Sequence, residues 1–170
     1  MIQRIQTVYM LASVISILMM LVMPLGTVSA NDAYFNVTAL GITSVTPGVP
    51  LDKMSYGLVT LLLLMLALPL VCIFLYKWRK VQLRILIYTA VLDVLFYGYF
   101  FLYEAPAMSS SAMQVLANVG FPTDVTADYT FTLYAMPLVS LFCCVMAWRG
   151  VAYDIALLSA ADRLRPSHRK

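Results

Sequence analysis

Four long apolar stretches dominate this chain and restrict its possible folds more than any other feature. They are residues 5–23, 56–76, 83–103 and 131–148. Each approaches the ~20 residues that a helix needs to cross ~30 Å of hydrocarbon. The composition agrees, because 62% of the residues are hydrophobic and only 11% are charged, whereas soluble domains have about 25% charged residues. The sequence therefore predicts an all-α membrane protein, an antiparallel four-helix transmembrane bundle.

The basic residues indicate how this bundle, a single domain of residues 1–170, is oriented. Ten of the eleven Lys and Arg residues fall on one side, and only Lys53 falls on the other. The ten are Arg4, Lys77, Arg79, Lys80, Arg84, Arg149, Arg163, Arg165, Arg169 and Lys170. By the positive-inside rule, both termini and the tail 149–170 are cytoplasmic. The outer loops 24–55 and 104–130 then lie on the opposite side.

The first apolar stretch has an alternative interpretation. Arg4 precedes it and Val28-Ser29-Ala30 follows it, which resembles a signal peptide with its cleavage site. The stretch is, however, longer than the ~7–15 apolar residues of a typical signal core. We therefore expect a retained helix, and the alternative is a cleaved segment that leaves three helices.

The outer loops and the tail contain weaker patterns. Residues 34–40 alternate polar and apolar side chains and 42–45 could pair with them, which fits either a small periplasmic β-element or a loosely structured loop. Ser109-Ser110-Ser111 precede a predicted short helix over 112–119, which Gly120 and Pro122 would end. Beyond Trp148 the apolar residues recur at helical spacing until Pro166. One interpretation of this tail is an amphipathic helix that lies along the inner leaflet or against a partner helix. The other is a solvated segment whose arginines enforce the topology.

Asp93 is the residue most suggestive of a functional site. It follows Arg84 by nine positions, or ~13–14 Å along a helix, which places it near the middle of the bilayer. A charge there costs at least ~2.5 kcal/mol, so the carboxyl group should face the bundle interior and be partnered or protonated. Thr89 and Tyr97, four residues before and after, share its helix face and complete a candidate intramembrane polar site.

Two hypotheses describe that site. We favour a hydrogen-bonded carboxyl group that fixes helix packing, because the other spans contain no second ionisable group and no basic partner for it. The alternative is a proton- or ion-responsive site, since intramembrane acids often mark such pathways. The candidate partners across the bundle are Ser13, Ser16, Thr60 and Ser140.

The sequence contains no motif for catalysis or for binding a metal, a cofactor or nucleic acid. Its three cysteines, Cys72, Cys143 and Cys144, form no disulfide framework and are expected to be packing residues. The single histidine, His168, lies in the tail. The tyrosines and phenylalanines between residues 96 and 103 are expected to form an aromatic belt with packing contacts, and not a cofactor pocket.

Both ends of the chain resemble a known family. Met1-Ile2-Gln3-Arg4-Ile5-Gln6-Thr7-Val8-Tyr9 and Ser159-Ala160-Ala161-Asp162-Arg163-Leu164-Arg165 are similar to the ends of a family of four-span inner-membrane proteins from Bacteroidota, domain of unknown function 4293. The resemblance implies a retained first helix and a location in the bacterial cytoplasmic (inner) membrane. It also suggests a cytoplasmic contact patch, between the chain ends or with a partner, although topology and interface anchoring would explain the same residues. The residues of this patch are Gln3, Arg4, Gln6, Asp162, Arg163 and Arg165.

These observations predict a non-enzymatic protein without a cofactor. We expect an accessory or scaffold component of a cytoplasmic-membrane complex, in contact with the lipid bilayer and with a membrane-protein partner or a second copy of itself. The alternative is a small proton- or ion-coupled transporter centred on Asp93.

Overall fold

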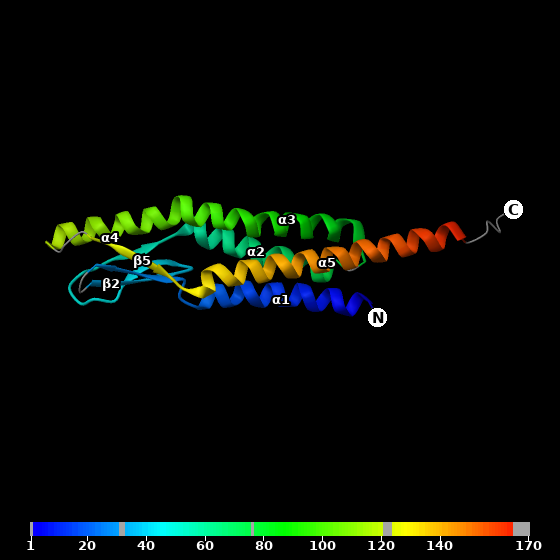
Figure 1. The fold of residues 1–170 in the computed structure, drawn as a ribbon, viewed down its shortest axis with the longest axis horizontal. Helices are drawn as coiled ribbons and strands as arrows, with labels where there is room; N and C mark the ends of the chain where they lie inside the picture. Colours follow the sequence, from blue (N-terminus) through cyan, green and yellow to red (C-terminus); the bar gives the residue numbers. More distant parts are fainter. Residues whose placement is uncertain (1, 31–32, 76, 121–123, 165–170) are drawn as a thin grey trace.

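The computed structural model describes residues 2–30, 33–75, 77–120 and 124–164, and the side chains of all these except residues 2–4 and 161–164. The molecule is elongated. A bundle of long helices has a β-sheet at one end, called here the sheet end, and both chain termini at the other, called the terminal end (Figure 1).

Four long helices form the bundle. They are α1 Ile2–Val22, α2 Tyr56–Phe74, α3 Arg79–Tyr99 and α5 Phe131–Leu164. α1 packs against α2 and α5, and α3 packs against the same two helices, so that each helix is antiparallel to both of its neighbours (Figure 1). By length and composition, each of these four helices could cross a membrane. For α3 this assessment includes the helical residues that follow it, up to Val119. Their outward faces are apolar too, as the half-exposed Ile15, Leu63 and Val94 illustrate, and this is typical of helices surrounded by lipid.

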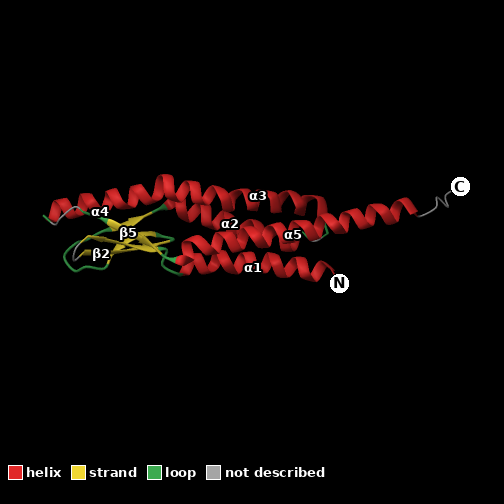
Figure 2. Ribbon diagram, viewed as in Figure 1, coloured by secondary structure: helices red, strands yellow, loops and turns green. Residues whose placement is uncertain are grey.

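The prediction of an all-α fold was wrong, because a five-stranded antiparallel sheet covers one end of the bundle (Figure 2). Its strands are β1 Gly26–Ala30, β2 Ala33–Thr38, β3 Gly41–Ser44, β4 Asp52–Met54 and β5 Thr126–Tyr129, in the order β4-β3-β2-β1-β5. The chain is therefore a mixed α and β protein. The hairpin that residues 34–45 indicated is present as β2 and β3. β4 and β5 were missed because they are short and their residues do not alternate between buried and exposed, and β1 was missed because its residues were considered only as a possible cleavage site. β5 also meets β1 from a loop about a hundred residues away, as the hydrogen bond between Ser29 and Thr126 shows.

The sheet and the adjoining half of the bundle share one hydrophobic core. Along β2, Phe35 and Val37 are buried while Tyr34 and Asn36 are exposed, as expected for a strand with one solvated face. The buried strand residues pack in one cluster with Leu58 of α2 and with residues of α3 and α5. A second cluster, which includes Met10, Cys72 and Cys144, fills the terminal end of the bundle.

α3 does not end where the sequence suggested. A π-helical turn, η1 Phe100–Glu104, joins it directly to α4 Ala105–Val119, which extends beyond the bundle beside the sheet (Figure 2). Residues 104–119, assigned from the sequence to an outer loop with a helix over 112–119, are thus helical throughout. The serines 109–111 do not cap a helix; their hydroxyl groups bond to carbonyl groups of the preceding turn. Gly120 ends the helix with a φ of 82°, as predicted, whereas Pro122 lies outside the described residues.

α5 continues well past the predicted span end at Trp148. Val151 and Asp154 of this extension are buried, and residues 156–160 are exposed. Val28 and Ala30, which belong to the alternative signal-peptide cleavage site, lie in β1 between β2 and β5.

Candidate functional site

Asp93 lies at the centre of the bundle with none of its surface exposed. The Ser140 Oγ on α5 donates to Asp93 Oδ2 at 3.1 Å and approaches Oδ1 at 3.3 Å. The Ser13 Oγ on α1 lies 2.8 Å from the Ser140 Oγ. These three side chains, called here the Asp93 cluster, connect α3, α5 and α1.

The donors in the Asp93 cluster can be assigned from its geometry. A serine hydroxyl group has one proton, so Ser140 cannot donate to both Asp93 and Ser13. Because the aspartate needs a donor, Ser13 donates to Ser140 and Ser140 donates to Asp93. Cys144 Sγ lies 3.6 Å from Ser13 Oγ at the edge of the cluster. Among the described side chains, no enclosed nitrogen or oxygen atom lacks a hydrogen-bond partner, so the cluster is internally satisfied.

Thr89 and Tyr97 lie on the same helix as Asp93 but bond elsewhere. The Thr89 hydroxyl group donates to the Ile85 carbonyl group at 3.0 Å, within α3. The Tyr97 hydroxyl group donates to the Tyr134 carbonyl group on α5 at 2.5 Å. Of the four candidate partners across the bundle, Ser13 and Ser140 join Asp93, whereas Ser16 and Thr60 bond to carbonyl groups of their own helices.

One residue of the predicted contact patch makes a described contact between the chain ends. The buried Gln6 donates from Nε2 to Asp154 Oδ2 at 2.9 Å. A β-carbon at Gly150 would lie 2.9 Å from Gln6 Cγ, so the absence of a side chain there allows this approach. Gln3 and Arg4 lie on α1, and Asp162 and Arg163 lie on α5, but their side chains are not described. Arg165 falls outside the described residues.

The α2–α3 hairpin is held to α1 by another buried amide. Gln82 donates from Nε2 to the Cys72 carbonyl group at 3.3 Å and approaches Met10 Sδ at 3.6 Å. Sequence analysis missed Gln82 because an amide at the edge of an apolar stretch gives no distinctive signal. The terminal end and the middle of the bundle are therefore linked internally by buried polar contacts.

The aromatic residues at the end of α3 pack mainly against protein. Phe96 and Phe100 are fully buried, and Phe100 and Phe101 both pack edge-on against Tyr129 of β5. Burial raises the pKa of the Tyr129 phenol, and its interaction with Tyr134 acts in the same direction. These rings connect the sheet to the bundle, which is the packing role expected for part of the predicted aromatic belt.

In addition to Asp93 and Asp154, the buried acids include Glu104, which the sequence analysis missed. It is the last residue of η1, is 5% exposed, and accepts hydrogen bonds at Oε1 from Ser55 Oγ and the Tyr99 hydroxyl group, at 2.5 and 2.6 Å. The available signal was a lone acid at the end of an aromatic run. Its enclosure depends on the π-helical turn Phe100–Glu104, for which the sequence gives no recognisable signal.

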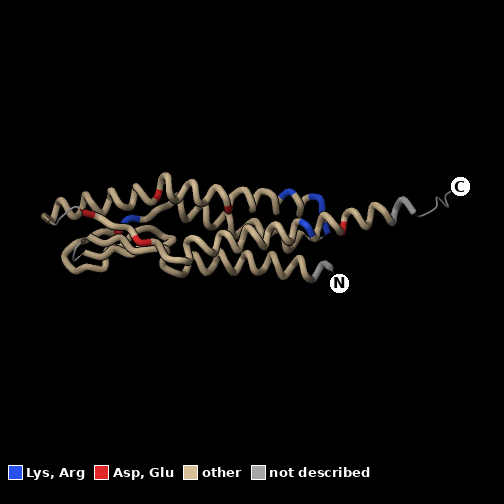
Figure 3. Tube along the Cα trace, in the orientation of Figure 1, with Lys and Arg blue, Asp and Glu red and all other residues tan. Residues whose placement is uncertain are grey.

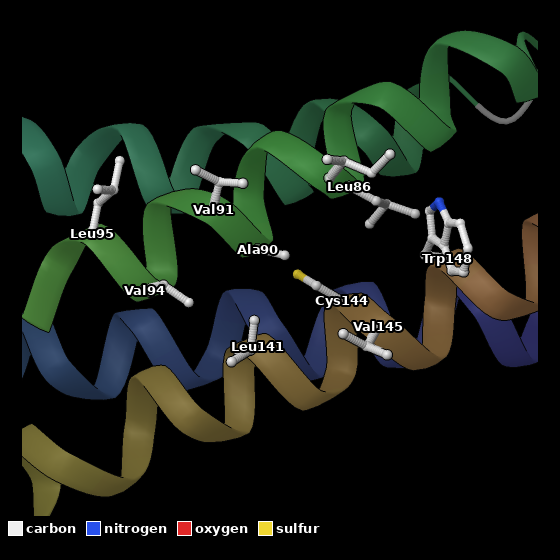
Figure 4. Close-up of a pocket in the computed structure, with 10 residues that line it drawn as sticks. Leu86, Ala90, Val91, Val94, Leu95, Leu141, Cys144, Val145 and Trp148 are labelled. Atoms are coloured by element: carbon white, nitrogen blue, oxygen red, sulfur yellow. The ribbon is translucent and has the colours of Figure 1, made fainter.

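An apolar hollow of about 410 Å³ lies between α3 and α5. Ala90 and Val94 line it from α3, and Leu141, Cys144 and Trp148 line it from α5 (Figure 4). Asp93 is not among its lining residues, so this hollow gives the carboxyl group no direct path to the surface. In the part of the chain that the structure describes, no three His, Cys, Asp or Glu residues are grouped as metal ligands.

The fold and these contacts define a class of protein: an antiparallel bundle of four helices of membrane-spanning length, cross-linked internally by buried polar side chains and covered at one end by a sheet. The chain belongs to the family described as domain of unknown function (DUF4293), whose model matches residues 2–164. The family that the two chain ends suggested is thereby confirmed. No curated protein matches the chain.

Proposed function

We propose that the chain is an integral protein of a bacterial cytoplasmic membrane, with its terminal end in the cytoplasm and its sheet end on the outer face. Most of the described Lys and Arg residues lie at the terminal end (Figure 3). This distribution supports the orientation through the positive-inside rule. The sheet and α4 then form a structured outer region.

Its proposed role is that of a non-enzymatic accessory or scaffold component of a membrane complex. The observation that carries this proposal is the enclosure of Asp93, whose carboxyl group is fully buried and hydrogen-bonded to Ser140. A carrier must open its site to water, and secondary transporters usually place several polar groups on interrupted helices at the midplane. An enclosed acid that links α3 to α5, and through Ser13 to α1, favours a fixed arrangement of helices.

The sheet offers a surface for a protein partner. β4 and β5 are its two edge strands, and the side chains of residues 52–54 and 126–128 are exposed. Edge strands have backbone groups that can pair with an added strand. We therefore place the partner contact of the proposed complex at the sheet end, with the lipid-facing helices as a second surface.

Affinity purification of the tagged, full-length chain from its native membrane in mild detergent tests this role. Mass spectrometry should find a defined partner at constant stoichiometry. Recovery of the chain alone, or only with itself, would contradict the scaffold proposal. The variant Asp93→Asn should recover the same partner, because asparagine can still accept the hydrogen bond from Ser140.

The alternative function is a proton- or ion-coupled transporter centred on Asp93, and the observation in its favour is a buried acid within a span. Asp93→Asn separates the two functions when the variant replaces the native chain in cells. A scaffold should tolerate the change, whereas proton coupling should be abolished even though the protein is still inserted and folded.

A further inference from the structure

A pocket of about 340 Å³ lies where the bundle meets the sheet, and it is distinct from the Asp93 cluster. It is bounded by β4, by the start of α2, by the end of α3 with η1, and by α4. Its lining includes Lys53, Tyr56, Tyr99, Tyr103, Glu104 and Met108. This volume is within the range of small-ligand sites, about 300–1,000 Å³.

The carboxyl group of Glu104 forms one side of this pocket. Both of its hydrogen bonds, from Ser55 and Tyr99, fall on Oε1. Oε2 is therefore available to accept a hydrogen bond from a ligand. With its side chain 5% exposed and held by two donors, Glu104 has a fixed position instead of a range of solvated rotamers.

The local backbone is adapted to hold this carboxyl group. The π-helical turn Phe100–Glu104 places Tyr99 and Glu104 so that the phenol bonds to the carboxylate, and such turns are frequent at functional sites. Gly57 leaves room for the Tyr99 hydroxyl group, since a β-carbon at this position would overlap it. α2, α3 and η1 thus combine to fix the carboxyl group of Glu104 in the lining of the pocket.

Lys53 lines the same pocket and has a different partner. Its Nζ donates to the Ser111 hydroxyl group on α4 at 2.8 Å. An ammonium group has three protons, so two remain for a ligand. The pocket therefore contains a fixed anion and a separately held cation, a pattern complementary to a ligand that carries both charges.

The position of the pocket indicates how such a ligand would reach it. The pocket lies at the end of the apolar helices, and the exposed Tyr56 and Tyr103 border it. Tyrosines are enriched at the level of lipid headgroups. The site therefore faces headgroups if the chain is inserted as proposed above.

We propose that this pocket binds a zwitterion with a primary ammonium group and a phosphate group, supplied by the headgroup of a phosphatidylethanolamine-type lipid in the leaflet on the sheet side. The ammonium group donates to Glu104, and Lys53 donates to the phosphate oxygens. Free phosphoethanolamine shares this chemistry. The inference rests on the membrane insertion in the proposed function, but not on the scaffold role.

Native mass spectrometry of the purified, full-length chain tests the site with three lipids of identical acyl chains. Phosphatidylethanolamine should be retained about tenfold more than phosphatidylcholine, whose ammonium group has no N–H to donate. Retention of phosphatidylethanolamine should exceed retention of phosphatidylglycerol, which has no ammonium group, by a similar factor. Equal retention of the three lipids would overturn the proposal without any variant being needed.

Variants then assign the selectivity to the pocket. Glu104→Gln keeps an acceptor for Ser55 and Tyr99 but removes the charge, so phosphatidylethanolamine retention should fall to the phosphatidylcholine level. Lys53→Met should weaken both of these lipids. The matched controls are Asp52→Asn, an exposed acid on β4, and Lys80→Met at the terminal end, and both should leave selectivity unchanged. Unchanged selectivity in Glu104→Gln, with an unfolding temperature like that of the native chain, would also overturn the proposal.

A competition experiment separates the two sources of the headgroup. Free phosphoethanolamine should fail to displace the lipid at equal concentration, because the acyl chains add binding energy along the apolar helices. Displacement at equal concentration would overturn the lipid origin. Partner recovery in the affinity purification is independent of these measurements, so failure of the scaffold role and failure of this site are distinguishable.

Discussion

Gln6 on α1 donates a 2.9 Å hydrogen bond to Asp154, which follows it by 148 positions on α5. The contact joins the two ends of the chain at the terminal end of the bundle. Both side chains are more than nine-tenths buried, so the hydrogen bond is protected from competing water. It also ties the extension of α5 beyond Trp148 to the bundle.

Gly150→Ala should weaken this contact, because the new methyl group would lie 2.9 Å from Gln6 Cγ. Relative to a Gly→Ala change at a helical position with open space, we expect a loss of about 1 kcal/mol in the free energy of unfolding, the net contribution of a typical hydrogen bond. The measurement is reversible unfolding of the purified protein in mixed micelles. The control is Gly98→Ala, a helical position with open space around it, which should be neutral or stabilising by up to about 1 kcal/mol. Equal effects of the two changes would contradict the proposed close packing of α1 on α5.

Ser140→Ala should destabilise the bundle, because it removes the donor to Asp93 and the partner of Ser13 at once. The expected cost is about 1–3 kcal/mol, the penalty for a buried polar group left without a partner. Asp93→Asn should cost less, since the amide oxygen can still accept from Ser140. The same unfolding assay measures both. Ser159→Ala, an exposed serine on the same helix, should change stability by no more than about 0.5 kcal/mol. A Ser140→Ala effect as small as this control would mean that the cluster does not lock the helices.

Gly57→Ala should disturb the pocket through Tyr99, whose hydroxyl group occupies the space of the added methyl group. The Tyr99 side chain must then move and lose its bond to Glu104, at a cost of about 1–3 kcal/mol. A double-mutant cycle tests the cause. In a Tyr99→Phe background the hydroxyl group is absent, so the penalty of Gly57→Ala should fall, with a coupling energy of at least about 0.5 kcal/mol. Strictly additive effects would show that the glycine is not required for this contact.

The proposed orientation predicts different accessibility at the two ends of the bundle. Leu40→Cys lies in the exposed turn between β2 and β3, and Lys80→Cys lies near the start of α3. A membrane-impermeant maleimide should label the first variant in cells with a permeabilised outer membrane, and the second only after lysis of the inner membrane. The native cysteines are buried, and the unmodified chain measures their background. The reverse labelling pattern would overturn the proposed topology.

The intramembrane acid illustrates how far local sequence could predict the site. The position of Asp93 within an apolar helix indicated a buried group, because a solvated or lipid-facing carboxylate there is unfavourable. Four hydroxyl groups were candidate partners, and the structure joins two of them, Ser13 and Ser140, into the Asp93 cluster. The choice among the four depends on how each helix is rotated about its axis. The sequence does not determine this rotation, because the helices are apolar on nearly all of their faces.

The outer region shows the limit of local patterns more clearly. The alternation of residues 34–40 predicted a strand because it reports burial on one face within a single segment. The alternation in β1, Gly26–Ala30, was overlooked, because Val28-Ser29-Ala30 was considered only as a possible cleavage site. The pairing of β1 with β5 joins segments from two separate loops. Glu104 was missed for a related reason, since its importance depends on η1 and on the approach of Ser55 from the start of α2.

The sequence by itself determined the four apolar helices, the basic terminal end and the family, because hydrophobicity, charge and the residues at the chain ends are properties of each segment alone. Only the tertiary structure decided the five-stranded sheet, the enclosure of Asp93 and the pocket around Glu104. Each of these depends on contacts between residues far apart in the chain, and their geometry follows from how rigid helices and strands pack together. Local side-chain patterns contain too little information to specify that packing.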